Sequence, residues 1–448
     1  MDTLAKLRAG QLTGATSISL KDAGLTSLPL ELASLASTLE QLDCSNNPSL
    51  SSLPSASTFP WHAFTRLKVV FLASCAFATF PAELGLCPAL SMVGFRSNRM
   101  RVIPEGALPG ALRWLILTGN ELEALPDDIG RCARLEKCML AGNQLTSLPA
   151  SMADCASLTL LRLASNQLPA LPAWLLDMPK LAFLAFAGNP CVPAVASPDA
   201  AAASATPDVS TAELAVGAVL GRGASGVISQ ARWKGEEVAV KVFHSSLITS
   251  DGAPADELAA SLLAGQHPNL ISVLGRLIDP RTAPPTPLGT VLSLLPPTYT
   301  ILGLPPTFGS CTRDVFPASF ASLSAGQAQA ILRGVAAAAA HCHSLGLAHG
   351  DLYAHNILFD PAADSERGHV LLTDFGAAVA YGRAHAWAAK VERVEVRAFG
   401  HLVEDVLGLV VDGEGDRWVG RAKALQAECV RAEVGARPAF EEVVERLR

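Results

Sequence analysis

Several features that define common protein classes are missing from this chain of 448 residues. No run of about 18 apolar residues occurs, so no membrane-spanning helix is expected. The opening residues MDTLAKLRAG lack the apolar core of a secretory signal. The ten cysteines contain no C-x-x-C pair and no Cys/His spacing of a metal site. Unpaired cysteines of this kind are typical of a reducing compartment, so we expect an intracellular, cytoplasmic protein.

Charge is also sparse, because only 17% of the residues are charged and the net charge is −7. Residues 1–190 carry 14 basic and 14 acidic side chains, and residues 191–448 carry 20 and 27. Neither half has the basic surplus of a nucleic-acid-binding protein, so no nucleic-acid partner is expected. Half of the residues are hydrophobic, which provides the cores of two or three folded domains.

A repeat of about 23 residues fills the first half. LILTGNELEALP (115–126) recurs as CMLAGNQLTSLP (138–149) and LRLASNQLPALP (161–172). The L-x-L part predicts a short strand, and the Asn side chain can bond the backbone of the turn that follows it. One unit cannot bury its apolar face alone, so about eight units are expected to stack into a curved solenoid. The repeated asparagines are Asn98, Asn120, Asn143, Asn166 and Asn189.

These units resemble the leucine-rich-repeat family, which implies an α/β solenoid over residues 1–190. The resemblance favours a protein ligand on the concave strand face, and the alternative is a purely structural wall. Three cysteines at equivalent repeat positions are interpreted as small buried side chains rather than metal or redox groups, namely Cys87, Cys132 and Cys155. The residues expected on the strand face are Arg96, Trp114, Lys137, Arg162 and Phe183.

A segment rich in Ala, Ser and Pro, residues 191–210, is interpreted as an interdomain linker, so the second domain spans residues 211–448. That domain opens with LAVGAVLGRGASGVISQARWKGEEVAVKVF (214–243). A lone G-x-G-x-x-G is weak evidence and also occurs in Rossmann turns, but a helix should follow a Rossmann turn. Here two β-like stretches follow, and the second one ends in V-A-V-K.

Further motifs come in order along the chain. They are a helix-like segment with Glu257 ahead of HPNL, then HGDLYAHN (349–356), then a D-F-G at 374–376, and finally ARPAFEEVVERL (436–447). Together with the glycine turn and V-A-V-K they resemble a protein kinase, with a closing segment similar to the tyrosine-kinase-like group. The resemblance implies a bilobal α+β domain, so the whole chain is expected to be a multidomain protein.

The roles that the resemblance implies can be assigned residue by residue. Lys241 would bind ATP phosphates with Glu257 as its partner, although Glu257 lies one residue further from HPN than is usual and a plain surface acid is the alternative. Asp351 would accept the proton of the substrate hydroxyl, while Asn356 and Asp374 would hold Mg²⁺. The remaining ATP-binding residues would be Gly221, Gly223, Gly226, Val227 and Ala239.

Three departures from the kinase pattern qualify this interpretation. Gly350 stands where many kinases have Arg, so the chain is of the non-RD type, and the segment from Asp374 to Glu395 contains no Ser or Thr. The loop cation is replaced by Tyr353 or His355, and His355 is either a γ-phosphate ligand or only a hydrogen-bonding residue. The peptide-binding platform is short. We therefore expect a protein Ser/Thr kinase acting in signalling, with an ATP-binding pseudokinase or a small-molecule kinase as the alternatives.

Overall fold

The computed structural model describes residues 2–192, 206–223, 225–244, 248–282, 286–317, 322–363, 368–411 and 415–448. The chain divides into two compact units. The first contains Met1–Lys180 and Asn189–Cys191, and the second contains Leu181–Gly188 and Val192–Arg448. Within the described residues, no helix combines the length and the apolar composition needed to cross a bilayer.

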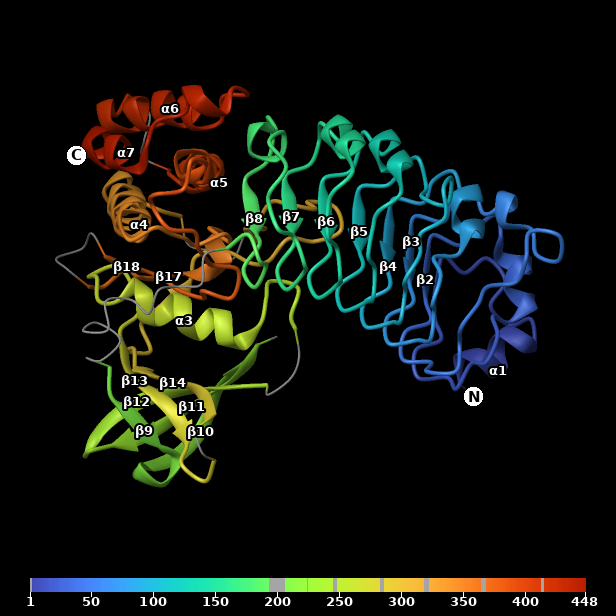
Figure 1. Ribbon diagram of the computed structural model, residues 1–448, viewed down its shortest axis with the longest axis horizontal. Coiled ribbons are helices and arrows are strands. Elements are labelled where there is room, and N and C mark those ends of the chain that lie inside the picture. Colours follow the sequence, from blue (N-terminus) through green and yellow to red (C-terminus); the bar gives the residue numbers. More distant parts are fainter. Residues whose placement is uncertain are drawn as a thin grey trace. The chain divides into compact units, whose positions relative to one another are not determined.

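The first unit is built on a parallel sheet whose strands follow one another in sequence order, as Figure 1 shows for β2 to β7. Each strand has only three residues, which fits the L-x-L pattern. A short helix α1, Thr3–Arg8, precedes the sheet and is capped by Asp2, whose Oδ1 accepts from the Ala5 N–H at 2.7 Å. The strands are β1 (Ser17–Ser19), β2 (Gln41–Asp43), β3 (Val69–Phe71), β4 (Met92–Gly94), β5 (Trp114–Ile116), β6 (Lys137–Met139) and β7 (Leu160–Arg162).

Short 3-10 helices return the chain between these strands. Several of them begin directly after the proline of L-x-x-L-P, because proline fixes φ and needs no N–H partner at that position. The three repeat cysteines lie beside these turns and are all buried, as expected. Burial raises the pKa of the Cys87 thiol to about 12, so these side chains are inert. The 3-10 helices are Leu30–Leu35, Trp61–Ala63, Ala82–Leu86, Asp127–Arg131, Ala150–Asp154 and Leu175–Asp177.

The repeated asparagines form a ladder that confirms the role predicted for them. In the repeat around Asn143, the side-chain Oδ1 accepts from the N–H of Leu122 at 3.1 Å. Its Nδ2 donates to the carbonyls of Leu117 at 3.0 Å and Leu140 at 2.8 Å. One buried amide therefore satisfies backbone groups of its own repeat and of the preceding one, where no strand partner exists.

Replacing Asn143 with Ala is expected to destabilise the repeats by about 2–4 kcal/mol, because three buried backbone groups lose their partner. The free energy of unfolding from a urea titration measures this loss. Gln144→Ala is the matched control, since Gln144 is exposed and its loss should cost less than about 0.5 kcal/mol. Equal losses of unfolding free energy in the two variants would contradict a stabilising role of the asparagine ladder.

The second unit begins with an antiparallel sheet in the order β10–β11–β12–β14–β13, and β9 pairs in parallel with β13 at its edge. Val238 and Val240, which point to the same face of β12, build a core with Val209 of β9 and Val291 of β14. Helix α3, Pro254–Ala264, follows β12 and ends at Gly265, whose φ is +61°. The strands are β9 (Asp208–Ser210), β10 (Leu214–Arg222), β11 (Gly226–Trp233), β12 (Glu236–Phe243), β13 (Val273–Asp279) and β14 (Thr286–Ser293), and a 3-10 turn covers Thr211–Glu213.

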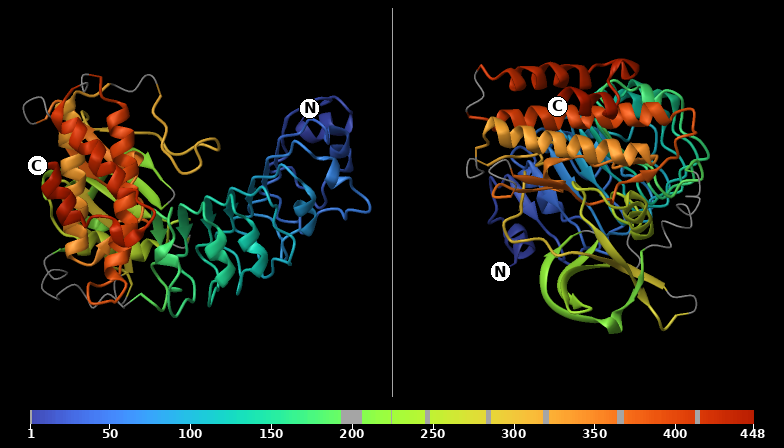
Figure 2. Two further views of the ribbon diagram at one scale, coloured as in Figure 1. Left: turned by 90° about the horizontal axis from the view of Figure 1, so that it is seen from above. Right: turned by 90° about the vertical axis from the view of Figure 1, so that its left-hand side faces the viewer.

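The remainder of this unit is mainly helical, and α4 to α7 pack together in orange to red in Figure 2. Small sheets beside them carry the loops of interest: β15 (Thr300–Ile301) with β17 (Ile357–Asp360) and β18 (His369–Leu372), and β16 (Leu347–Ala348) with β19 (Val379–Ala380). Short 3-10 turns cover Ala354–Asn356 and Val434–Ala436. The helices are α4 (Ala325–Ser344), α5 (Ala388–Gly408), α6 (Arg417–Cys429) and α7 (Phe440–Leu447).

The expected fold, repeats with a parallel sheet followed by a domain with a mixed sheet and helices, is confirmed. The domain boundaries stay a prediction, and two features bear on them. Residues 193–205 of the expected linker lie outside the described residues, but Asp208–Ser210 forms strand β9. Strand β8, Phe183–Ala185, falls in the segment grouped with the second unit.

Candidate functional site

Lys241 and Glu257 form a buried ion pair between strand β12 and helix α3. Their side chains are 12% and 5% exposed. Burial raises the pKa of the Glu257 carboxyl, the Lys241 ammonium opposes this, and the charge of Asp374 adds to it. Glu257 is therefore the partner of Lys241 in spite of its unusual spacing from HPN, and it is not a surface acid.

The HGDLYAHN loop, residues 349–356, brings Asp351 and Asn356 together. The Asn356 Nδ2 donates to the backbone oxygen of Asp351 at 2.9 Å and to its carboxylate Oδ2 at 2.8 Å. Both donor hydrogens of this amide are thereby engaged, which leaves Asn356 Oδ1 as its remaining ligand atom. His349, the first residue of the loop, connects it to the segment after β18, since its Nε2 lies 2.9 Å from the Thr373 carbonyl.

Asp374 follows strand β18 with a left-handed backbone, φ +62°. Its Oδ1 accepts from the N–H of Gly376 at 3.1 Å. The preceding residue Thr373 ties this segment to the HGDLYAHN loop, because its Oγ1 and its N–H both donate to the Asn356 carbonyl at 2.9 Å. Phe375 is buried, with its ring centroid 5.1 Å from that of His349.

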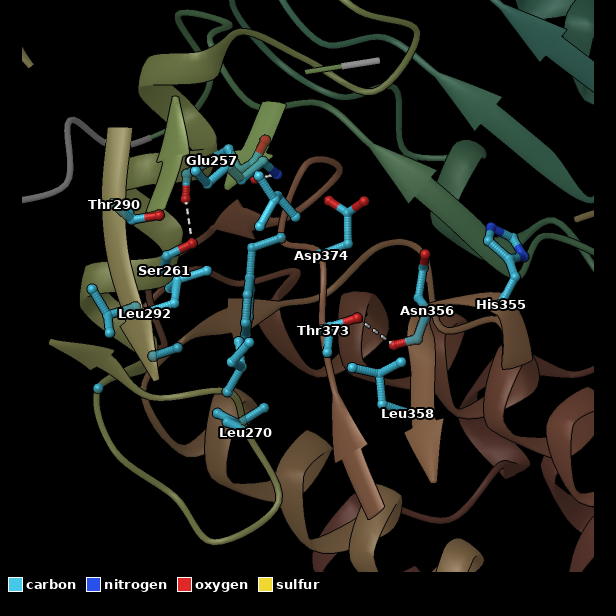
Figure 3. A pocket seen from close by; sticks show the side chains of 17 residues that line it. Glu257, Ser261, Leu270, Thr290, Leu292, His355, Asn356, Leu358, Thr373 and Asp374 are labelled. Atoms are coloured by element: carbon cyan, nitrogen blue, oxygen red, sulfur yellow. Dashed lines mark hydrogen bonds and ion pairs between the residues drawn. The ribbon is translucent and has the colours of Figure 1, made fainter. Parts of the chain in front are cut away.

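One cavity of about 240 Å³ connects these groups. Lys241, Glu257, Asn356 and Asp374 all line it, as do Thr373 and His355 (Figure 3). Carboxylate and amide oxygens therefore line the same cavity as the ammonium group of Lys241. Its apolar wall includes Leu270, Val273, Leu292 and Leu358.

The glycine-rich turn forms the expected β10–β11 hairpin and no helix follows it, which excludes a Rossmann turn. The Gly223 N–H donates to the Gly226 carbonyl at 2.9 Å. A Cβ on Gly226 would collide with the Val242 carbonyl of β12, so this position requires glycine. Ala239 pairs with Leu292 and Val227 with Val242. Gly221, Gly223, Val227 and Ala239 do not line the cavity and belong to the sheet beside it or, for Gly223, to the turn between β10 and β11.

Family models match both parts of the chain. Residues 214–396 match the protein kinase domain, and residues 110–168 match the leucine rich repeat. The chain combines leucine-rich repeats with a protein kinase domain. An alignment of 184 residues with mouse leucine-rich repeat serine/threonine-protein kinase 1 shows 30% identity and covers 35% of this chain and 8% of that protein. A solved leucine-rich-repeat protein of Leptospira interrogans is similar with a TM-score of 0.33 and 26% identity, over 40% of this chain and 50% of that chain.

A buried acid of helix α5 holds the HGDLYAHN loop of the kinase domain. Glu395 of α5 is 2% exposed and accepts from the N–H groups of His349 and Gly350. It also lies 2.6 Å from the Nε2 of His343, whose Nδ1 lies 2.9 Å from the Tyr381 hydroxyl. Burial opposes its ionisation, but His343 and the loop N–H groups keep the Glu395 pKa below its usual value.

Gly350 of the kinase domain has φ +74°, a conformation that costs an ordinary residue about 1–2 kcal/mol. A Cβ there would also meet the carbonyls of Ala377 and Leu184. This explains why no arginine stands at the position. Gly350→Ala should therefore lower the free energy of unfolding by about 2–4 kcal/mol, since overpacking adds to the strain.

Chemical unfolding measures the effect of this substitution. Gly408→Ala at the end of α5 is the control, because a Cβ there meets nothing within 4 Å. That change should leave stability unaltered or raise it by about 0.5–1 kcal/mol. A Gly350→Ala protein as stable as the unmodified protein would show that neither strain nor contact is present.

Tyr353 and His355 stand where many kinases carry a loop cation. Their contacts are with aromatic rings and with Asp314, an acid that the sequence did not reveal. Tyr353 is buried, and its ring centroid lies 3.9 Å from that of Phe183 within the second unit and 5.0 Å from that of His355. Asp314 lies 2.7 Å from the His355 Nδ1. Burial lowers the His355 pKa, but Asp314 with Asp351 and Asp374 outweighs this, so the pKa lies above its usual value.

The segment after Asp374 is short, as the sequence indicated. Strand β19 is followed by Tyr381, whose N–H donates to the Gly346 carbonyl at 2.8 Å, and helix α5 begins at Ala388. Only residues 382–387 separate Tyr381 from this helix, in the region where a kinase builds its peptide platform.

Proposed function

We propose that the chain is an ATP-dependent protein kinase that transfers the γ-phosphoryl group to a Ser or Thr hydroxyl. The observation that carries the proposal is the convergence of the Lys241–Glu257 pair, Asn356 and Asp374 on one cavity. Asp351 is bonded to Asn356 at the edge of the same group. Phosphoryl transfer needs positioned charge more than covalent chemistry, and this set supplies it.

In this proposal Lys241 binds the α and β phosphates, and Glu257 directs its ammonium group. The hairpin with Gly221, Gly223 and Gly226 covers the phosphates, since glycine lets the backbone approach them closely. Leu358, which lines the cavity, forms part of the apolar contact surface for adenine, and Val227 and Ala239 would contribute from the strands beside the cavity. Leu292 of β14, which pairs with Ala239 of β12, lines the cavity as well.

The residues fit a magnesium ion. Asn356 Oδ1 remains after both amide hydrogens are engaged, and the Asp374 carboxylate lines the same cavity. Hard oxygen donors of this kind are what Mg²⁺ prefers. When bound, the ion would neutralise phosphate charge. Asp351 would accept the proton of the attacking hydroxyl, within a loop held by Glu395.

The short segment between Tyr381 and α5 favours a second candidate function, an ATP-binding pseudokinase that acts through its repeats. In either case we propose that the repeats bind a protein through the strand face around Trp114 and Lys137, where the Lys137 Nζ lies 4.2 Å from the Trp114 ring centroid. Phe183 is removed from this surface, since it is buried against Tyr353. A cytoplasmic location and a role in signalling stay predictions.

The test is to measure ADP formation with ATP and Mg²⁺ in the presence and absence of a generic protein acceptor. A protein kinase should form ADP faster with the acceptor and leave phosphoserine or phosphothreonine on it. Equal ADP formation with and without acceptor would contradict protein phosphorylation, and binding of ATP without any turnover would favour the pseudokinase.

A further inference from the structure

The segment between β15 and α4 contacts the HGDLYAHN loop through a buried acid, Asp314. Its side chain is 1% exposed. One carboxylate oxygen accepts from the backbone N–H of His355 at 3.0 Å, and the other lies 2.7 Å from the imidazole Nδ1 of the same residue. This two-point contact fixes both the backbone and the ring of His355.

The segment that carries Asp314 is itself firmly anchored. Leu304 and Val315 exchange two backbone hydrogen bonds of 3.0 Å across its base. The guanidinium of Arg313 is ion-paired with Glu404 and Asp405 of helix α5. The carboxylate of Asp314 is therefore presented by a braced turn between the HGDLYAHN loop and α5.

The braced turn also packs closely against the HGDLYAHN loop. A Cβ on Gly303 would lie 2.9 Å from the Ala354 Cβ and 3.0 Å from the Phe316 ring, so glycine is needed for this approach. Ala354 directly precedes His355. A displacement of the braced turn would consequently shift both Ala354 and His355 of the loop.

The contact bears on the site because His355 is adjacent to a proposed metal ligand. The His355 side chain is 19% exposed and lines the cavity, and the next residue is Asn356, which bonds the Asp351 carboxylate. With Nδ1 engaged by Asp314, the ring is held in one orientation against the Tyr353 ring. The carboxylate of Asp314, which lies outside the loop, thus holds His355 and through it the neighbouring Asn356 and Asp351.

We propose that Asp314 is a positioning residue for phosphoryl transfer, which holds His355 and thereby sets the geometry of Asp351 and Asn356. The assignment rests on the proposed kinase function. None of the kinase motifs in this sequence includes this acid, and it lies 41 residues before its partner. Outer-shell partners that orient functional side chains typically contribute about 10–100-fold to activity.

The experiment measures kcat and the KM for ATP of Asp314→Ala, Asp314→Asn, His355→Ala and the double variant Asp314→Ala/His355→Ala. We expect kcat to fall about 10–100-fold in Asp314→Ala while KM stays within about threefold, because geometry is lost and nucleotide contacts are not. Asp314→Asn keeps one acceptor oxygen and should lose less. The double variant should lose no more than the larger single loss, because both changes remove the same contact.

Thr307→Ala is the matched control in the same segment, since Thr307 is exposed and its hydroxyl bonds within the turn. Melting temperatures of all variants show whether folding is kept, and Asp314→Asn serves if the alanine variant does not fold. An unchanged kcat in Asp314→Ala, or additive losses in the double variant, would overturn the assignment while leaving the kinase function intact. Absence of transfer by the unmodified protein would instead overturn the proposed function, and this assignment with it.

Discussion

Replacing Asp351 with Asn should lower the rate of phosphate transfer to protein by about 10²–10⁴-fold, the usual contribution of a positioned general base. The amide has nearly the same shape and keeps an oxygen that can accept from the Asn356 Nδ2, but it cannot take the hydroxyl proton. The initial rate of phosphate incorporation at saturating ATP and Mg²⁺ measures the effect.

The loss should be confined to the transfer step. Nucleotide affinity should change by less than about threefold, because Asp351 does not line the cavity that holds Lys241 and Asp374. Asp416→Asn is the matched control, since Asn caps a helix as well as Asp and α6 would keep its N-cap. A comparable loss of rate in both variants would contradict a specific role for Asp351.

Replacing Lys241 with Met should destabilise the kinase domain by about 3–5 kcal/mol, in addition to abolishing transfer, because a buried carboxylate loses its paired cation. Glu257 would then face Asp374 without compensation, and both desolvation and that charge already raise its pKa. The free energy of unfolding in guanidinium measures the effect. Lys234→Met, in the turn between β11 and β12, is the exposed control.

The double variant Lys241→Met/Glu257→Gln separates stability from function. Removing the second charge should restore a large part of the lost stability, because an uncharged pair is cheaper to bury than a single charge. It should not restore transfer, since the phosphates still lack their cation. Additive destabilisation in the double variant would show that the two side chains do not depend on one another.

Local sequence patterns predicted much of this fold. The repeated asparagines predicted a ladder because their spacing matches one structural unit, and Asn143 makes the bonds that this requires. Glu257 was the correct partner of Lys241 although counting back from HPN gave an offset of one residue. The ion pair between the two side chains decides this, because it places Glu257 against Lys241 whatever its distance from HPN along the chain.

Contacts between distant segments were out of reach of such patterns. Asp314 and Glu395 hold the HGDLYAHN loop from a proline-rich segment and from helix α5, at separations of 41 and 45 residues. Neither position belongs to a periodic pattern that would predict its partner. Strand β9 was missed for a similar reason, because it pairs with β13, where Arg276 bonds Asp208 across 68 residues.

The most direct test of the central claim is the rate of γ-phosphoryl transfer from ATP to a protein acceptor by the full chain with Mg²⁺, compared with Asp351→Asn at matched nucleotide occupancy. The structure predicts protein-bound phosphate for the unmodified chain and a rate about 10²–10⁴-fold lower for the variant. Nucleotide-bound protein of both kinds with no difference in transfer would contradict the assignment of this cavity to protein phosphorylation.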